Sequence, residues 1–498
     1  MTHLKKLTFS WDWTLLLIGA ALRLRQYLSG RSLWADEAML ALNIVNRDFM
    51  GLLKPLDYDQ GAPIGFLWVM KIINLTLGRT ELVLRLFPFA AGILSLYLFY
   101  LLIRKITDRA GTLTALALFA VNPSIIYYSS ESKQYIVDVA IALGLLALAY
   151  PVFSARENKQ DLIRLGVGGI IALWFSHPAL FVLAGMGVAL VVQFLQKREY
   201  TSLRTMVIIA LLWLADLGAL YFISLRHLSR NEYLATYWEA GFIPMPPWSN
   251  PGWFPVSYGE NVQFQFGIQI LPFLVLIFLV MGWVLLYREK QSFALAIALI
   301  VVISFTASAL RYYPVSGRLS LFLIPLWCIL LGAAIDGIQR TLASRKFIST
   351  ASAILLGGYL LIAPAIVSLE NFISPKYYEH IRPTMSYLSE SWKEDDVIFV
   401  SFWAEPAFRF YAPFYGLEGI EFESSEYEDY PDPQKLKSRI EPLLGQKRVW
   451  VLFSHVYEEA GFNERDFLVS YLNEVGEQRR EILKPGTSVY LFFYDLSR

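Results

Sequence analysis

Long runs of apolar residues, separated by short polar segments, dominate the first three quarters of the chain. A helix that crosses a membrane needs about 20 consecutive apolar residues. Such runs predict eleven transmembrane helices before residue 370. They lie near residues 9–28, 80–103, 111–128, 135–153, 165–177, 178–196, 205–225, 267–287, 292–310, 319–336 and 347–367.

The loop after the first run carries apolar patterns of its own. Residues 63–77 are apolar but too short to cross a membrane. Residues 36–53 place apolar side chains at the spacing of one helix face. We expect both segments to form helices at the outer membrane interface, with re-entry partway into the membrane as the alternative for residues 63–77.

The pattern changes after residue 370, where helical and strand periodicities alternate. We expect strands near 396–401, 448–454, 478–484 and 487–494, and helices near 376–391, 403–414, 433–443 and 463–475. This order predicts a small α/β domain with a mostly parallel sheet. The fold class is therefore a polytopic α-helical membrane domain over residues 1–369, followed by an α/β domain over residues 370–498.

Composition agrees with a membrane protein. The chain is 56% apolar and 17% charged, whereas a soluble domain has about 25% charged residues. A net charge of +1 gives no reason to expect nucleic acid as a partner. The charge is divided, at +10 for residues 1–369 and −9 for residues 370–498, which supports two units.

The basic residues predict the orientation in the membrane. Lys5, Lys6, Arg104 and Arg340 fall in segments that would share one side, and basic loops stay in the cytoplasm. We therefore expect a cytoplasmic (plasma) membrane protein with its N-terminus inside. An odd number of spans places the C-terminal domain outside the cytoplasm.

Adjacent carboxylates begin the first interfacial helix. Asp36 and Glu37 stand directly after the first span, on the expected outer side. One interpretation is helix capping, because acidic groups stabilise a helix N-terminus. The other is a general base held where lipid headgroups meet water.

Two further polar clusters fall on the same expected side of the membrane. A hydrophilic turn or headgroup anchoring would explain them. However, arginine in an outer loop runs against the usual charge distribution, and guanidinium groups match phosphate oxygens. The clusters comprise Glu131, Lys133 and Tyr135 after the third span, and Arg311, Tyr313 and Arg318 between the ninth and tenth spans.

Other polar residues in or near the spans have no assigned role at this stage. A buried charge pair or a water-facing position explains Arg85, Asp138 and Asp216 as well as function does. We interpret His177, which precedes Pro178, as part of a hairpin turn and not as a ligand.

The order of these motifs resembles the GT-C membrane glycosyltransferases. Trp34 to Glu37, the segment led by Pro63, and Glu81 to Pro88 resemble the branch that includes protein O-mannosyltransferases and lipid A aminoarabinose transferases. The segment from Tyr128 to Tyr135 resembles that branch's Tyr-x-x-Glu-x-Arg-x-Tyr element, with Lys133 in place of arginine. The chain lacks the lysine that aminoarabinose transferases carry before the proline.

This resemblance implies inverting transfer of a hexosyl or pentosyl group from a polyprenyl-phosphate sugar to a lipid, glycan or protein acceptor. Asp36 would be the base, and Glu37 would support it or orient the acceptor. Lys133, Arg311 and Arg318 would hold phosphate, while Glu131, Tyr135 and Tyr313 would shape the substrate site. We expect no cofactor, although Asp36 and Glu131 could offer two oxygens to a divalent metal.

Two other function classes remain open from the sequence. A secondary transporter or lipid flippase is the main alternative, but transporters tend to show repeated halves and polar residues near the membrane midplane. A scaffold protein with a sensing C-terminal domain is the third possibility.

Overall fold

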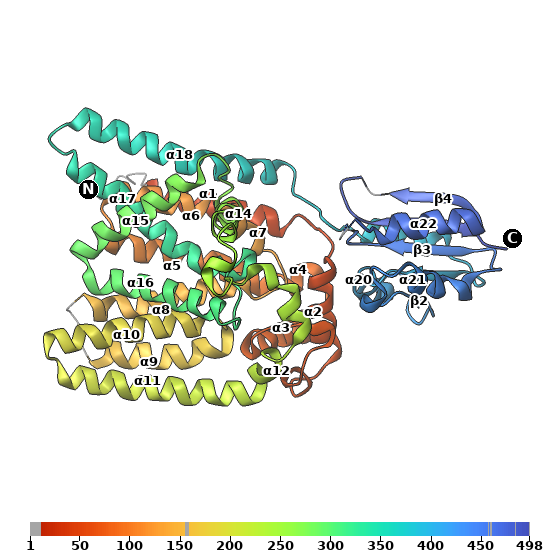
Figure 1. Cartoon of the computed structure of the whole chain (residues 1–498), viewed down its shortest axis with the longest axis horizontal. Coiled ribbons are helices and arrows are strands. Elements are labelled where there is room, and N and C mark those ends of the chain that lie inside the picture. Colours follow the sequence, from red (N-terminus) through yellow and green to blue (C-terminus); the bar gives the residue numbers. More distant parts are fainter. Residues whose placement is uncertain (1–10, 155–158, 457, 459–460, 484, 498) are drawn as a thin grey trace, which may run out of the picture.

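The computed structural model describes residues 11–154, 159–456, 458, 461–483 and 485–497. It has two parts, a helical body and a C-terminal domain built on a sheet, which lie end to end along the long axis (Figure 1). The long helix α18 (Lys346–Ile373) leads from the body toward the C-terminal domain. This arrangement confirms the predicted fold class of a polytopic helical protein with a C-terminal α/β domain.

Eight helices of the described chain are long and apolar enough to cross a membrane. Their mean hydropathy follows directly from the apolar runs in the sequence. They are Leu86–Ile106 (α5), Tyr135–Phe153 (α8), Ala179–Lys197 (α10), Tyr200–Leu228 (α11 and its extension), Pro272–Glu289 (α15), Gln291–Ala309 (α16), Gly317–Thr341 (ending in α17, Ile324–Thr341) and Lys346–Ile373 (α18).

The other three expected spans are also helical but shorter. They correspond to α1 (Trp11–Tyr27), to α6 (Arg109–Ala120) with α7 (Pro123–Tyr128), and to α9 (Lys159–Phe175). Helix α6 has 12 residues, which is below the length that crosses a bilayer core alone. The number of eleven spans therefore stays a prediction.

The two expected interfacial helices are present in the first loop. The first is α2 (Ala35–Asn46), followed by a short turn of helix at Gly51–Leu53, and the second is α3 (Ile64–Leu77). Helix α3 has 14 residues and ends at Gly78, which adopts a φ of 92°. A positive φ is easily reached by glycine, so the sequence itself ends this helix.

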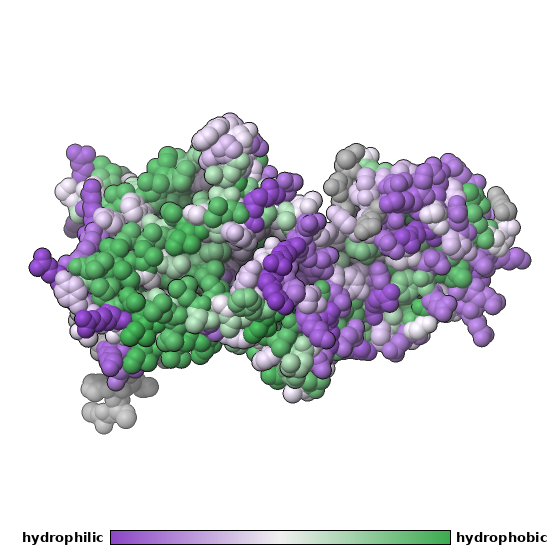
Figure 2. Space-filling view, turned by 60° about the horizontal axis from the view of Figure 1, so that its bottom comes forward, coloured by the Kyte–Doolittle hydropathy of each residue, from purple (hydrophilic) through white to green (hydrophobic). Residues whose placement is uncertain are grey.

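The helical body is organised around its tenth predicted span. In the segment Gly317–Thr341, 89% of an 18-residue apolar stretch is buried, and α17 packs between α6 and α15. Helix α8 packs against α5, and α10 packs against α16. The outer faces of the helices are apolar, so the body carries a broad hydrophobic surface, whereas the C-terminal domain is mostly hydrophilic (Figure 2). This distribution fits a body that sits in lipid and a domain in water.

The C-terminal domain contains a five-stranded sheet in the order β2-β1-β3-β5-β4. The four expected strands are confirmed, and β2 is an additional short one. The prediction of a mostly parallel sheet is wrong, because β1 pairs in parallel with β2 and β3, whereas β5 is antiparallel to both β3 and β4. The strands are β1 (Val397–Val400), β2 (Glu423–Ser424), β3 (Val449–Phe453), β4 (Glu477–Leu483) and β5 (Tyr490–Asp495).

The mixed sheet has a simple cause. A parallel pair needs a crossover connection, usually a helix, while a few residues suffice to join antiparallel strands. Helix α21 (Pro433–Ile440) lies between β2 and β3, and α22 (Glu464–Val475) follows β3. The last two strands are joined by a short turn, which makes them an antiparallel pair.

Ion pairs lie at the end of the body that carries the start of α1. Arg109 pairs with Asp12 at 2.6 Å, and Arg340 pairs with Asp108 at 2.6 Å. Asp12 stands in the first turn of α1, and the N-terminal end of that helix lies away from the C-terminal domain (Figure 1). Lys5 and Lys6 lie outside the described residues. The compartment that each end faces stays a prediction.

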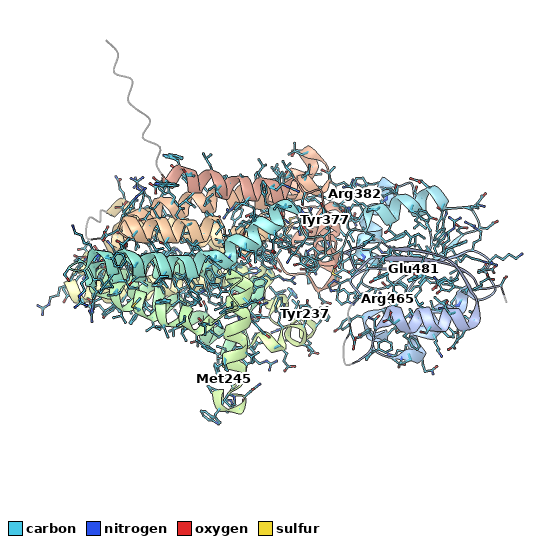
Figure 3. All side chains as sticks on the ribbon, turned by 90° about the horizontal axis from the view of Figure 1, so that it is seen from above. Tyr237, Met245, Tyr377, Arg382, Arg465 and Glu481 are labelled. Carbon is cyan, nitrogen blue, oxygen red and sulfur yellow. The ribbon has the colours of Figure 1, made fainter. Side chains whose placement is uncertain are left out.

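The body and the C-terminal domain make direct polar contacts. The Tyr377 hydroxyl donates a hydrogen bond to the carbonyl of Ser29 at 3.0 Å, and Arg382 pairs with Glu81 at 3.3 Å. Tyr377 and Arg382 both lie where the two parts meet (Figure 3). Met245, by contrast, lies at the tip of a projection from the side of the body. The predicted boundary at residue 369 falls inside α18, shortly before this junction.

Candidate active site

The carboxylate pair of the first loop stands in the first turn of α2. The helix begins after Trp34, whose backbone is extended, and the Trp34 side chain makes no capping hydrogen bond. Asp36 does not cap the helix either, because its oxygens contact side chains from distant segments. The amide of Ala35 donates instead to the Glu379 carboxylate of the C-terminal domain at 2.8 Å. The capping interpretation therefore does not explain Asp36.

Asp36 lies between two cations. Its Oδ1 accepts a hydrogen bond from Lys133 Nζ at 2.8 Å, and its Oδ2 is 3.1 Å from the Arg318 guanidinium. Lys133 also donates to Gln60 Oε1, at the start of the interfacial segment before α3. Burial raises the pKa of Asp36, but the charges of Lys133 and Arg318 outweigh it and lower the pKa to about 2. The carboxylate is thus ionised at neutral pH.

Glu37 points away from Asp36 into a buried ion pair. It accepts two hydrogen bonds from Arg85, at 2.8 and 2.6 Å, and both side chains are at most 1% exposed. The Ser132 amide also donates to Glu37, and Arg85 donates to the carbonyls of Arg31 and Ser32. These contacts join three segments of the chain. The geometry therefore favours a supporting role for Glu37 over contact with an acceptor.

Glu131 is buried without a partner for its carboxylate. Neither oxygen has a hydrogen bond among the described residues, and the residue is 1% exposed. Burial first, and then the charge of Glu37, raise the pKa of Glu131 to about 7, against the opposing charges of Arg31 and Arg318. A carboxyl group with this pKa can exchange a proton near neutral pH.

Arg318 stands at the start of the buried helical segment and is surrounded by rings. Its guanidinium lies 5.3 Å from the ring of Trp34, 5.5 Å from Tyr135 and 5.3 Å from Trp238. Cation–π contacts stabilise an arginine that is partly removed from water. The rings hold the guanidinium beside Asp36 while 15% of the side chain stays exposed.

Arg311 and Tyr313 approach the same space from the loop after α16. Arg311 is 56% exposed and forms a 3.3 Å pair with Glu239, so it does not contact the Asp36 group. The Tyr313 hydroxyl donates to the carbonyl of Leu319 at 3.0 Å. The structure thus brings Asp36, Lys133, Tyr135 and Arg318 into contact, with Arg311 and Tyr313 farther along the wall.

Two cavities meet at this group. The first, of about 500 Å³, is lined by all the predicted site residues except Glu37 and Glu131. The second, of about 710 Å³, is lined by Glu131 and Tyr128. Three side chains line both cavities, namely Trp34, Arg318 and His455. Arg318 can therefore contact a ligand in either cavity, with Asp36 directly beside it.

Comparisons with known proteins agree with this architecture. The family described as dolichyl-phosphate-mannose-protein mannosyltransferase matches residues 61–221. The crystal structure of ArnT from Cupriavidus metallidurans in the apo state has a TM-score of 0.53 at 12% identity and covers 97% of both chains. The Archaeoglobus fulgidus oligosaccharyltransferase, in a complex with Zn and sulfate, has a TM-score of 0.55 at 14% identity, over 89% of this chain and 68% of that one.

The chain has the GT-C fold. The resemblance predicted from the sequence motifs is confirmed at this level. ArnT has also been solved bound to undecaprenyl phosphate, with a TM-score of 0.52 at 12% identity over 97% of each chain. A search of curated proteins by sequence gave no significant match.

The GT-C fold brings residues into the site that the sequence motifs did not reveal. Arg85, to which no role was assigned, holds Glu37, and Gln60 holds Lys133. Glu379 and His455 come from the C-terminal domain, and their distance in sequence gives no signal of this proximity. Only Arg85 could have been suspected from the sequence, because it lies in the segment Glu81 to Pro88 that resembles the glycosyltransferase family.

Metal ligation has limited support. Within the described part of the chain, no three His, Cys, Asp or Glu side chains are grouped so as to hold a metal ion. Asp36 already contacts two cationic side chains, which neutralise the charge that a metal would need. That the protein works without a cofactor stays a prediction.

Proposed function

We propose that this protein is an inverting glycosyltransferase that moves a sugar from a polyprenyl-phosphate carrier to an acceptor at the outer face of the cytoplasmic membrane. The observation that carries the proposal is the contact of one carboxylate, Asp36, with two cations, Lys133 and Arg318, on the wall of a 500 Å³ cavity. The family match, and relatives solved with undecaprenyl phosphate or dolichol-phosphate, support a lipid-linked donor.

The two cations suit the leaving group of this reaction. When the bond between the sugar C1 and the phosphate oxygen breaks, the polyprenyl phosphate keeps the electron pair and gains negative charge. Arg318 and Lys133 are placed to stabilise that charge in a partly water-excluded site. Rings around the guanidinium fix its position, so little reorganisation is needed.

Asp36 suits the role of base. An acceptor hydroxyl attacks C1 from the side opposite the phosphate, which forms the new glycosidic bond with inverted configuration. The hydroxyl proton passes to Asp36. In the ligand-free protein two cations lower the pKa of Asp36 to about 2. An incoming phosphate would share those cations, which raises the proton affinity of the carboxylate during the reaction.

The decisive experiment is sugar transfer by the purified protein in lipid nanodiscs. The donors are synthetic polyprenyl phosphates that carry labelled hexoses or pentoses, and a cell-envelope extract supplies the acceptor. We expect transfer by the wild type and a loss of roughly 10²-fold or more with Asp36→Asn, as is usual for proton-transfer groups. Asp57→Asn is the matched control, because Asp57 is 66% exposed and pairs with Arg47 in the same loop.

Two outcomes would contradict the proposal. If the wild type releases sugar from none of the donors, the protein is not this kind of transferase. If Asp36→Asn turns over as fast as the Asp57→Asn control, the carboxylate is not the base. Identifying the glycoconjugate missing from cells that lack the protein would name the natural sugar and acceptor.

A further inference from the structure

A second polar group lies in the first cavity, apart from Asp36 and its cations. It consists of Asp138 in the first turn of α8, His177 in the turn between α9 and α10, and Tyr313. Asp138 follows Tyr135 by three residues, so the two side chains share one face of the helix. The group is thus built by three separate parts of the fold that converge on one space.

Asp138 is a buried carboxylate whose hydrogen bonding is incomplete. The residue is 5% exposed, and its Oδ1 has no partner among the described residues. Its side chain shares a hydrogen bond with the Ser176 side chain, and among the described residues Asp138 forms no ion pair. An unmet buried acceptor costs free energy, so such a group usually has a ligand or a functional reason.

A partner that brings hydrogen-bond donors would complete this group. Ionised phosphate would not complete this group, because it brings only acceptor oxygens and no donor for the free Asp138 oxygen. A sugar ring fits, since its neighbouring hydroxyl groups donate to carboxylate oxygens and accept from an imidazole. The rings of Tyr135 and Tyr313 supply apolar surface beside them, and a cavity of about 500 Å³ is in the usual range for small ligands.

We propose that Asp138, with His177 and Tyr313, binds the hydroxyl groups of the donor sugar. This inference rests on the proposed function and assigns the sugar-binding end of its donor site. The cavity then has two polar places with different partners: Arg318 and Lys133 attract the phosphate, and the free oxygen of Asp138 accepts hydrogen bonds from hydroxyl groups. This asymmetry orients a sugar phosphate in one direction, with its anomeric carbon near Asp36.

The test measures binding of two probes by the protein in nanodiscs. One is a polyprenyl phosphate that carries a neutral hexose, and the other is the same polyprenyl phosphate without sugar. We expect Asp138→Leu to lower the affinity for the sugar-bearing probe by roughly tenfold or more, because its hydroxyls lose their acceptor. Affinity for the sugar-free probe should stay within about twofold. Asp138→Asn keeps an acceptor oxygen and should lose much less.

Matched controls separate this effect from damage to the fold. Asp216→Asn changes another carboxylate of a spanning helix, which accepts from Trp174 at 3.0 Å and does not line the cavity. It should leave both affinities unchanged. His177→Ala changes a residue of the same group in a different segment. It should also lower the affinity for the sugar-bearing probe and leave the affinity for the sugar-free probe unchanged.

Three results would overturn the inference. The first is a wild type that binds both probes equally, and the second is an Asp138→Leu protein that still prefers the sugar-bearing probe. The third is an equal loss with Asp138→Asn and Asp138→Leu, which would indicate a positively charged ligand instead of hydroxyls. Failure of the proposed function looks different, because then the wild type transfers no sugar whatever the behaviour of these variants.

Discussion

Glu379 accepts a hydrogen bond at 2.8 Å from the backbone amide of Ala35, the residue that precedes Asp36. Its other oxygen lies 2.5 Å from Nδ1 of His455, which lines both cavities. One carboxylate of the C-terminal domain therefore completes the N-terminus of the helix that carries Asp36. This contact indicates that the domain positions the helix that carries Asp36.

Replacing Glu379 tests this positioning role. We expect Glu379→Ala to lower kcat for sugar transfer by about tenfold or more, because small displacements of reacting groups are costly. The KM for the donor should change little, since Lys133 and Arg318, the proposed phosphate ligands, belong to the helical body. Glu405→Ala is the control, because Glu405 is a carboxylate of the same domain that forms an ion pair with Arg409 on its own helix. A Glu379→Ala protein with normal kcat would show that the domain serves another purpose.

The Glu37–Arg85 pair should be a large contributor to stability. Both side chains are fully buried, and removing one partner leaves the other charge without compensation. We expect Glu37→Gln or Arg85→Ala to lower the free energy of unfolding by about 3–5 kcal/mol. Thermal unfolding of detergent-solubilised protein measures this effect.

The surface pair of Arg409 and Glu405 gives the comparison for that prediction. Its arginine is 50% exposed, so Arg409→Ala should cost at most about 1 kcal/mol. Equal losses in Arg85→Ala and Arg409→Ala would contradict a structural role for the buried pair. A Glu37→Gln protein that is fully stable yet inactive would instead place Glu37 in the chemistry.

The helices were largely predictable because apolar runs of the right length have few alternatives in a membrane. All eleven predicted spans correspond to helices in the described part of the chain, although α6, with 12 residues, is too short to cross alone. The sheet was harder. Periodicity places strands such as Val449–Phe453 but does not give their direction, which depends on the length of each connection.

The site residues that could be predicted are charged residues at positions where a membrane protein rarely has them. Asp36 and Glu37 are acidic residues beside a span, and Arg318 is a basic residue on the expected outer side. Their contacts were not predictable, because Glu379 is 344 residues from Ala35 along the chain. The role of Asp138 could not be predicted from the sequence. A single acidic residue in an apolar run has the same sequence pattern whether its side chain only packs inside the protein or binds a ligand.

Arg318 and Arg311 should differ strongly although both are arginines of the same loop region. Arg318 is held by three rings beside Asp36, whereas Arg311 is exposed and pairs with Glu239. We expect Arg318→Ala to weaken binding of sugar-free polyprenyl phosphate by roughly tenfold to hundredfold, as for a charged hydrogen bond. Arg311→Ala should lose about threefold or less. Similar losses of affinity in both variants would mean that the phosphate is attracted by the overall positive charge of this region and not by direct contact with the Arg318 guanidinium.

Glu131 should make stability depend on pH near neutrality. Its pKa is raised to about 7 in the folded protein from 4.5, so the folded state keeps a proton that the unfolded chain releases. This contribution is fully present below pH 4.5 and is lost as the pH rises through 7. Asp36 does not interfere, because its lowered pKa affects stability only as the pH falls from 3.8 toward 2.

The measurement compares unfolding temperatures of the wild type and Glu131→Gln at pH 5 and pH 8. Glu464 in the C-terminal domain has a pKa raised to about 7 by burial, so it adds a slope of the same sign to both proteins. The difference between them isolates Glu131. We expect Glu131→Gln to gain stability relative to the wild type on going from pH 5 to pH 8, because the amide has no proton to lose. A difference that stays constant over this range would show that Glu131 does not change its protonation between pH 5 and pH 8 in the folded protein, which contradicts the prediction.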